Sequence, residues 1–178
     1  MADASPPHAR GCGGLCRRHR AHRRRDAAPG VTVGVILDSS VLIAAERGHF
    51  RLEALLESMG DTPVAIAAIT ASELLHGVHR AGSRGIRMRR AAFVEALLVE
   101  LPVLPFGLGE ARMHAELWAE LARGGTTIGA HDLLIAATAI AGGDALVTLN
   151  QREYARVPGL RLQSISEFVE RTEPDRAN

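Results

Sequence analysis

The chain has 178 residues, an apolar fraction of 47% and a net charge of +1, which fits one globular domain with an appendage. Basic and acidic residues nearly balance, so bulk charge does not indicate nucleic-acid binding. The apolar run 31–45 is short and contains an aspartate, which argues against export and against membrane insertion. Both cysteines, Cys12 and Cys16, precede this run, so we expect no disulfide framework and a cytoplasmic location.

The N-terminal segment differs in composition from the remainder of the chain. Residues 1–30 contain seven arginines against two acids, whereas residues 31–178 contain 14 arginines against 18 acids. We predict that residues 1–30 form a disordered, Arg-rich extension, and a translation start near Val31 or Val33 is the alternative. We expect a second disordered tail at residues 172–178.

Short apolar runs alternate with helical patterns from residue 33 onward. The expected strands are 33–37, 64–67, 101–106, 145–149 and 160–165, and the expected helices are 40–47, 50–59, 71–81, 85–99, 108–123, 130–141 and 166–171. Strands that alternate with helices favour a parallel sheet with helices on both faces. We therefore predict an α/β fold, a three-layer α/β/α sandwich on a mainly parallel sheet, over residues 33–171.

Four acidic or amide side chains follow these apolar runs or lie just inside them. They are Asp38 in VGVILDSSVLIA, Glu73 in ITASELLHGV, Asp132 in IGAHDLLIAATA and Asn150 in LVTLNQREY. Side chains at the carboxyl ends of parallel strands, and in the first turns of the helices that follow, point into one crevice. A cluster of carboxylates without a nearby cation is electrostatically costly, so it indicates a metal site, and oxygen ligands suit Mg²⁺ or Mn²⁺.

Each of these residues also has a purely structural interpretation. Asp38 can cap the helix that follows it, and Glu73 can form a capping box with Thr70. Asp132 can stabilise a helix through its dipole, and Asn150 can form an Asx turn. The common placement of the four residues at one edge of the sheet favours the metal site.

The stretch from about residue 33 to residue 170 resembles the PIN-domain ribonucleases, and most closely the VapC-type toxins of bacterial type II toxin–antitoxin modules. The matching segments are ILDSSVLIA, ITASELLHGV, IGAHDLLIAATAIAGG and LVTLNQREYARVPGL. The resemblance implies a PIN-like domain in which Asp38, Glu73 and Asp132 form the acidic site for Mg²⁺, with Mn²⁺ as the alternative. Asn150 stands where many relatives have a fourth acid, and it completes the predicted catalytic set.

The same resemblance implies a metal-dependent endoribonuclease that cleaves structured RNA such as tRNA or rRNA and arrests growth. It also implies a cognate antitoxin as partner and a homodimer. The alternatives are a housekeeping PIN nuclease in RNA processing and a catalytically inactive PIN scaffold that binds RNA or a partner protein. A phosphatase of the haloacid-dehalogenase kind would need an aspartate where Ser40 stands and a lysine, and the chain has no lysine.

Four arginines gather where the helix expected over 85–99 begins: Arg84, Arg87, Arg89 and Arg90. They can form a solvated helix face or a rim that contacts RNA phosphates. We favour the rim, because basic residues elsewhere in the expected domain are dispersed.

Overall fold

The computed structural model describes residues 34–170, so the tails predicted at 1–30 and 172–178 lie outside the described residues. Strands and helices alternate along this range, as the apolar pattern predicts. The elements are β1 (Val35–Leu37), α1 (Ser39–Glu46), α2 (Leu52–Met59), β2 (Val64–Ala67), α3 (Ala68–His79), α4 (Arg84–Glu100), β3 (Val103–Leu104), α5 (Leu108–Arg123), α6 (Ala130–Gly142), β4 (Ala145–Val147), α7 (Gln151–Tyr154), β5 (Arg161–Leu162) and the 3₁₀ helix η1 (Ser166–Phe168).

The five strands form one parallel sheet in the order β3-β2-β1-β4-β5, which confirms the predicted fold class. Leu37, at the end of β1, lies opposite Ile66 of β2 and Val147 of β4. The chain extends the sheet from β1 toward β3 and then returns to the other side of β1. The connections therefore diverge between β1 and β4, and in open parallel sheets ligands bind in the crevice beyond such a point.

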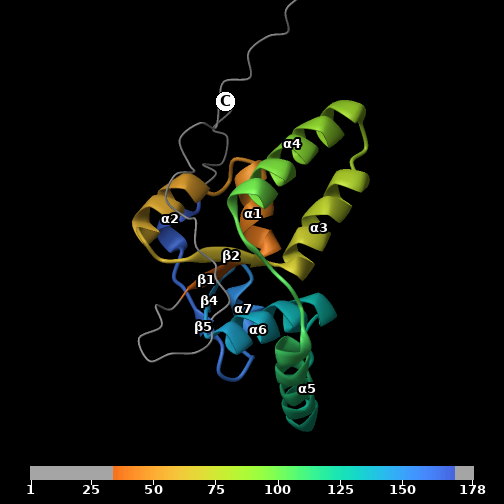
Figure 1. Ribbon diagram of the computed structural model, residues 1–178, viewed down its shortest axis with the longest axis vertical. Helices are drawn as coiled ribbons and strands as arrows, with labels where there is room; N and C mark the ends of the chain where they lie inside the picture. Colours follow the sequence, from red (N-terminus) through yellow and green to blue (C-terminus); the bar gives the residue numbers. More distant parts are fainter. Residues whose placement is uncertain (1–33, 171–178) are drawn as a thin grey trace, which may run out of the picture.

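Alternate residues of the central strands enter two separate cores. Val35 and Leu37 of β1 belong to the core formed with α1 to α4. Ile36 and Leu146 belong to the second core, formed with α5 and α6. Figure 1 shows these two groups of helices on opposite sides of the sheet. Because β1, β2 and β4 are buried on both faces, their sequences are continuous apolar runs rather than alternating ones.

The C-terminal elements differ from their predictions. The helix expected over 166–171 is the short 3₁₀ helix Ser166–Phe168, and α7 was not predicted at all. Four residues are too few to establish a helical period, so sequence pattern alone does not detect an element such as α7. The end of α6 agrees with its Gly-Gly signal, because Gly143 has a φ of 68° and caps the helix in the left-handed conformation.

Strand pairing around β3 covers only part of residues 101–106, where a short, Pro-bounded strand or an extended segment is expected. Two residues are paired, because Pro102 and Pro105 flank them and neither carries a backbone N–H for a ladder. The carbonyl of Pro102 still accepts a hydrogen bond of 3.0 Å from the backbone N–H of Ile66. Over residues 34–170, no helix combines the length and the apolar character that crossing a bilayer requires.

β4 is an interior strand of the sheet, and its burial leads to a stability prediction. Leu146→Ala should lower the free energy of unfolding by about 2–5 kcal/mol, because Leu146 is fully buried and truncation leaves a cavity. Met88→Ala, at a residue that is 63% exposed, is the control and should change it by less than about 0.5 kcal/mol. Urea unfolding followed by circular dichroism measures both, and equal losses would contradict the assignment of Leu146 to the core.

Candidate active site

Asp38 lies between the end of β1 and the start of α1, at the divergence of the connections. Its backbone N–H donates to the carbonyl of Val147 at 2.9 Å, so the pairing of β1 with β4 continues up to this residue. The side chain is 3% exposed and makes no capping hydrogen bond to α1. The capping interpretation of Asp38 is therefore not supported, and its carboxylate is available to the crevice.

Two hydroxyl groups fix one oxygen of this carboxylate. Oδ2 of Asp38 accepts hydrogen bonds from Ser40 Oγ at 2.6 Å and from Thr148 Oγ1 at 2.8 Å. These hydroxyls accept in turn from the backbone N–H groups of Leu149 (3.1 Å) and Asn150 (2.9 Å). The loop after β4 is thus tied to Asp38, and the carboxylate is held in one orientation.

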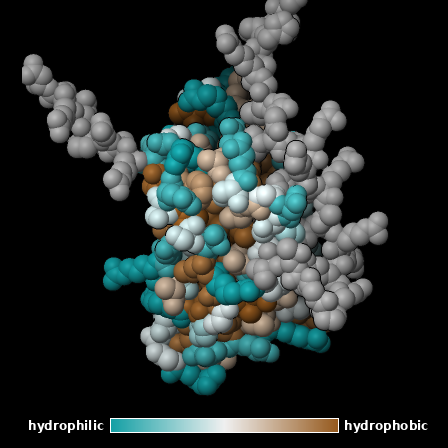
Figure 2. Space-filling model, turned by 90° about the vertical axis from the view of Figure 1, so that its left-hand side faces the viewer, coloured by the Kyte–Doolittle hydropathy of each residue, from teal (hydrophilic) through white to brown (hydrophobic). Residues whose placement is uncertain are grey.

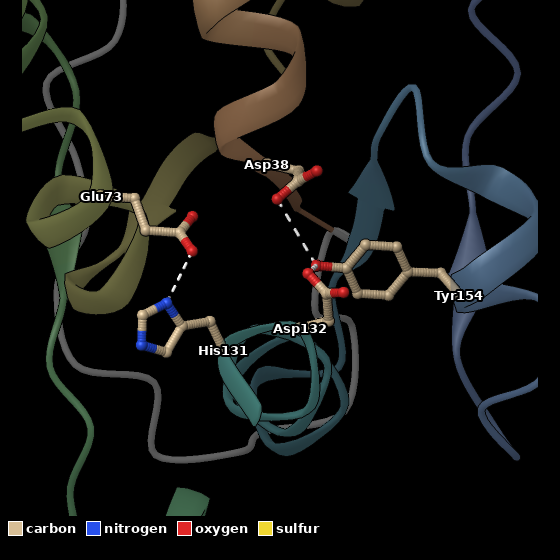
Figure 3. Close-up of polar contacts among 5 residues, drawn as sticks. All are labelled: Asp38, Glu73, His131, Asp132 and Tyr154. Atoms are coloured by element: carbon tan, nitrogen blue, oxygen red, sulfur yellow. Dashed lines mark hydrogen bonds and ion pairs between the residues drawn. The ribbon is translucent and has the colours of Figure 1, made fainter. Parts of the chain in front are cut away.

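Asp132 lies in the first turn of α6 and meets Asp38 at a shared tyrosine. The hydroxyl of Tyr154, at the end of α7, is 3.2 Å from Asp132 Oδ1 and 3.4 Å from Asp38 Oδ1. Figure 3 shows the two carboxyl groups facing each other across this hydroxyl. Two acids that are 94 positions apart in the printed sequence therefore share one hydroxyl group as hydrogen-bond donor.

Glu73 lies beside this pair but contacts a histidine. Its Oε1 is 2.8 Å from Nδ1 of His131, the residue that precedes Asp132 on α6 (Figure 3). The contact is an ion pair when the imidazole is protonated. The capping box with Thr70 is wrong, because α3 begins at Ala68 and Thr70 lies buried within the helix. The carboxylate of Glu73 thus points toward α6 rather than toward its own helix end.

Asn150 occupies the N-cap position of α7, at the same edge of the sheet. Its side chain makes no capping hydrogen bond, and its backbone N–H is the group that contacts Thr148. The residue is exposed, and its side chain makes no hydrogen bond to Asp38 or Asp132. Glu153, one turn further, forms an ion pair with Arg156.

The electrostatics of the site reflect burial and mutual repulsion. Burial raises the pKa of Asp132 above its ordinary value, the negative charges of Asp38, Glu73 and Glu153 raise it further, and the hydrogen bond from Tyr154 opposes them. Burial also raises the pKa of Tyr154, as do the charges of Asp38 and Asp132. The tyrosine therefore keeps its proton and acts as a hydrogen-bond donor to the acids.

The donor set fits a hard divalent cation. None of the ion pairs found within residues 34–170 involves Asp38 or Asp132, so their charge is not balanced by a basic side chain there. Within the same range no three His, Cys, Asp or Glu side chains lie close enough together to bind one ion. Mg²⁺ commonly binds through one or two carboxylates and completes its shell with water and substrate oxygens, so the pair suffices. The metal roles predicted for Asp38, Asp132 and Glu73 stay predictions.

Sequence analysis missed the residues that support the acids. Thr148 and Tyr154 carry no acidic or metal-binding motif of their own. The signal for Thr148 is register: Leu37 pairs with Val147, so the next residues along, Asp38 and Thr148, are neighbours once β1 and β4 are known to pair. The contact of Tyr154 depends on α7, an element that the sequence pattern does not reveal.

The sequence model of the PIN-domain family matches residues 35–160 of this chain. "Ribonuclease VapC1" of Rickettsia felis is 37% identical over 134 residues, which cover 75% of this chain and 98% of that protein. A "tRNA(fMet)-specific endonuclease VapC" of Salmonella typhimurium is 34% identical over 60% of this chain and 78% of its own length. Among solved structures, VapBC2 of Rickettsia felis bound to a DNA fragment from its promoter matches with a TM-score of 0.67 and 30% identity, over 72% of this chain and 96% of that chain.

The raised pKa of Asp132 leads to a prediction about stability. Folded Asp132 binds a proton more tightly than unfolded Asp132, so its ionised form opposes folding at neutral pH. Asp132→Asn should therefore raise the melting temperature of the metal-free protein, because the amide carries no charge that folding must desolvate. The gain should shrink as the pH falls toward the ordinary pKa of an aspartate. Glu120→Gln, at an exposed acid of α5, is the control, and a gain that does not depend on pH would contradict the explanation.

Proposed function

The chain belongs to the VapC ribonucleases of the PIN-domain family, and on that premise we propose that it cleaves RNA at the site of Asp38 and Asp132 with a divalent cation, Mg²⁺ or Mn²⁺. The observation that carries the proposal is the meeting of these two carboxylates at one buried hydroxyl, with no basic side chain of residues 34–170 paired to either. Like charges so arranged favour a cation between them.

In this mechanism the residues of the chain bind and orient. Asp38 and Asp132 would hold the cation, while Ser40 and Thr148 keep the carboxylate of Asp38 in its orientation. When bound, the cation lowers the pKa of a water molecule and neutralises charge on the scissile phosphate. Attack of water on phosphorus, with departure of the 3′ oxygen, leaves 3′-OH and 5′-phosphate ends.

Glu73 and Asn150 have supporting roles in the proposal. Glu73 lies at the edge of the pair and partners His131, so it would orient a water molecule or bind a second ion after leaving the imidazole. Asn150, exposed at the same edge of the sheet, would offer a neutral amide oxygen. An amide adds no negative charge, so a second ion would be held less tightly than by a fourth acid.

We propose structured RNA, such as tRNA or rRNA, as the substrate class. The support is the Salmonella relative that is described as specific for tRNA(fMet). The protein would read shape and unstacked bases rather than a duplex sequence, as is general for RNA recognition.

The arginines of α4 fit this substrate only in part. Arg90 is half-buried, forms an ion pair with Glu46 at 3.4 Å and donates to the carbonyl of Gly77 at 3.2 Å, so it joins α4 to α1 and α3 instead of contacting RNA. The prediction that Arg90 belongs to a rim that contacts RNA phosphates is therefore wrong. Arg84, Arg87 and Arg89 are exposed, and they lie near the outer end of the α3–α4 pair, away from the sheet (Figure 1). They would contact phosphates of an extended RNA at a distance from the cut.

An apolar groove supports a cognate antitoxin as partner. It lies between α2 and α4, has a volume of about 540 Å³, and its apolar lining includes Phe50, Leu52, Leu56, Phe93, Leu97 and Leu101. Figure 2, which looks onto the side of the molecule that carries α2, shows apolar residues among hydrophilic ones on this face. An amphipathic helix with apolar anchors one turn apart suits such a groove, and we propose that the antitoxin provides one.

We also propose a homodimer. Large apolar side chains are exposed at the end of α4 and on α5, among them Val99 (82% exposed), Leu108 and Trp118. Exposed apolar side chains are what an interface between copies would bury.

Two substitutions test the site. Asp38→Asn and Asp132→Asn should each lower Mg²⁺-dependent cleavage of total RNA by more than about 100-fold, since each removes a direct ligand and loss of a merely supporting partner already costs 10–100-fold. EDTA should abolish cleavage by the wild type. Asp61→Asn, an exposed acid in the turn before β2 at the opposite edge of the sheet, is the matched control and should cleave normally. Cleavage retained by either site variant would remove the assignment.

A second test separates a toxin from a housekeeping nuclease. A toxin should arrest growth on expression, and its antitoxin, encoded beside it, should restore growth. Ala96→Arg fills the groove at an exposed position of α4 and should weaken antitoxin binding by at least about tenfold, the effect of ~1.4 kcal/mol, while leaving cleavage unchanged. Ala119→Arg, at an exposed alanine of α5, is the control and should leave both antitoxin binding and cleavage unchanged. Normal growth with active enzyme would favour the housekeeping role, and equal binding by both variants would exclude the groove.

A further inference from the structure

The ring and the hydroxyl of Tyr154 have different surroundings. The residue is fully buried, and its ring packs in the core that α5 and α6 form with Ile36 and Leu146. A phenylalanine would fill the same space in that core. Packing therefore accounts for an aromatic ring at this position but not for the hydroxyl.

The hydroxyl is used only at the candidate active site. A buried hydroxyl is costly unless it is hydrogen-bonded, and within residues 34–170 the hydrogen bonds of this one are those to Asp132 Oδ1 at 3.2 Å and Asp38 Oδ1 at 3.4 Å. Both are long for O–H···O bonds, as expected of a single proton shared by two acceptors. The hydroxyl thus bridges the two acids and makes no hydrogen bond to α7 or to the loop that follows it.

We propose that Tyr154 is a positioning residue for the divalent-cation site, and that its hydroxyl holds Oδ1 of Asp38 and Oδ1 of Asp132 toward each other before the ion arrives. This inference rests on the proposed function. Ser40 and Thr148 fix the other oxygen of Asp38, so the carboxylate is held at both ends. Because one proton serves one acceptor at a time, the hydroxyl can release either carboxylate to the ion and still donate to the other.

The opposite role would make the hydroxyl a competitor of the ion for the same oxygens. The geometry favours positioning, because the two contacts are long and therefore weak, so giving one of them up costs little. Without the hydroxyl, the buried carboxylate of Asp38 and the half-buried carboxylate of Asp132 would face each other with no donor between them and would turn apart. The two roles predict changes of opposite sign in metal affinity.

Titration calorimetry with Mg²⁺ distinguishes them. Tyr154→Phe should raise the dissociation constant for Mg²⁺ by about 10–100-fold, the usual cost of losing a group that orients a ligand, without changing the circular dichroism spectrum or the melting temperature by more than a few degrees. Thr138→Val is the matched control, because it removes another buried hydroxyl, on the helix of Asp132, that donates to the carbonyl of Leu134. It should bind Mg²⁺ as the wild type does.

The outcomes separate this inference from the function on which it rests. If the wild type binds Mg²⁺ and Tyr154→Phe binds it equally well or more tightly, the positioning role is overturned and the metal site stands. If the wild type binds no more tightly than Asp38→Asn, both fail together.

A spectroscopic measurement tests the contact itself. Tyr154 is the single tyrosine of the chain, so incorporation of 3-fluorotyrosine gives one ¹⁹F resonance. Addition of Mg²⁺ should shift this resonance in the wild type and leave it in place in Asp132→Asn. A resonance that does not move in the wild type would show that the hydroxyl does not take part in ion binding.

Discussion

The repulsion between Asp38 and Asp132 is the interaction on which the site depends. Two carboxylates that share one buried hydroxyl repel each other, and this repulsion adds to burial, the larger cause, in raising the pKa of Asp132. Hydrogen-bond donors offset part of this repulsion, since Asp38 accepts from Ser40, Thr148 and Tyr154. A set of neutral donors leaves the net charge of the pair unchanged. Under the proposed function a bound cation would supply the balancing charge, which a structural ion pair would instead obtain from a basic side chain.

The fold holds these like charges together through backbone pairing rather than through contacts between the acids. Asp38 directly follows β1, and its N–H still bonds to the last residue of β4, so the central strands determine its position. Both faces of these strands are covered by helices, and truncating a core residue is costly. Asp132 enters on α6, whose apolar residues are packed in the second core. Burial of both faces thus offsets the unfavourable free energy of holding two carboxylates close together.

The sequence predicts the elements with a strong apolar pattern, and it predicts the acids because each follows such a pattern or lies just inside it. It fails where position depends on tertiary contact. Thr148 and Tyr154 become recognisable only through the β1–β4 register and through a four-residue helix. The capping box at Thr70 failed for a related reason: α3 follows β2 without a loop, so the helix begins before the residue whose chemistry suggests a cap. The spacing of Thr70 and Glu73 is compatible with a capping box, but a helix that begins at Ala68 leaves Thr70 inside the helix and not at its start.

The charge of the site also limits how RNA reaches it. An acidic crevice repels a polyanion, so attraction must come from a bound cation and from arginines outside the crevice. In the described range Arg51, Arg90 and Arg156 are paired with glutamates, whereas the exposed arginines at the start of α4 lie away from the sheet. Cleavage and substrate attraction are thus assigned to different parts of the molecule. Loss of an α4 arginine would therefore change RNA affinity and its salt dependence, whereas loss of an acid would change the cleavage rate of RNA that is already bound.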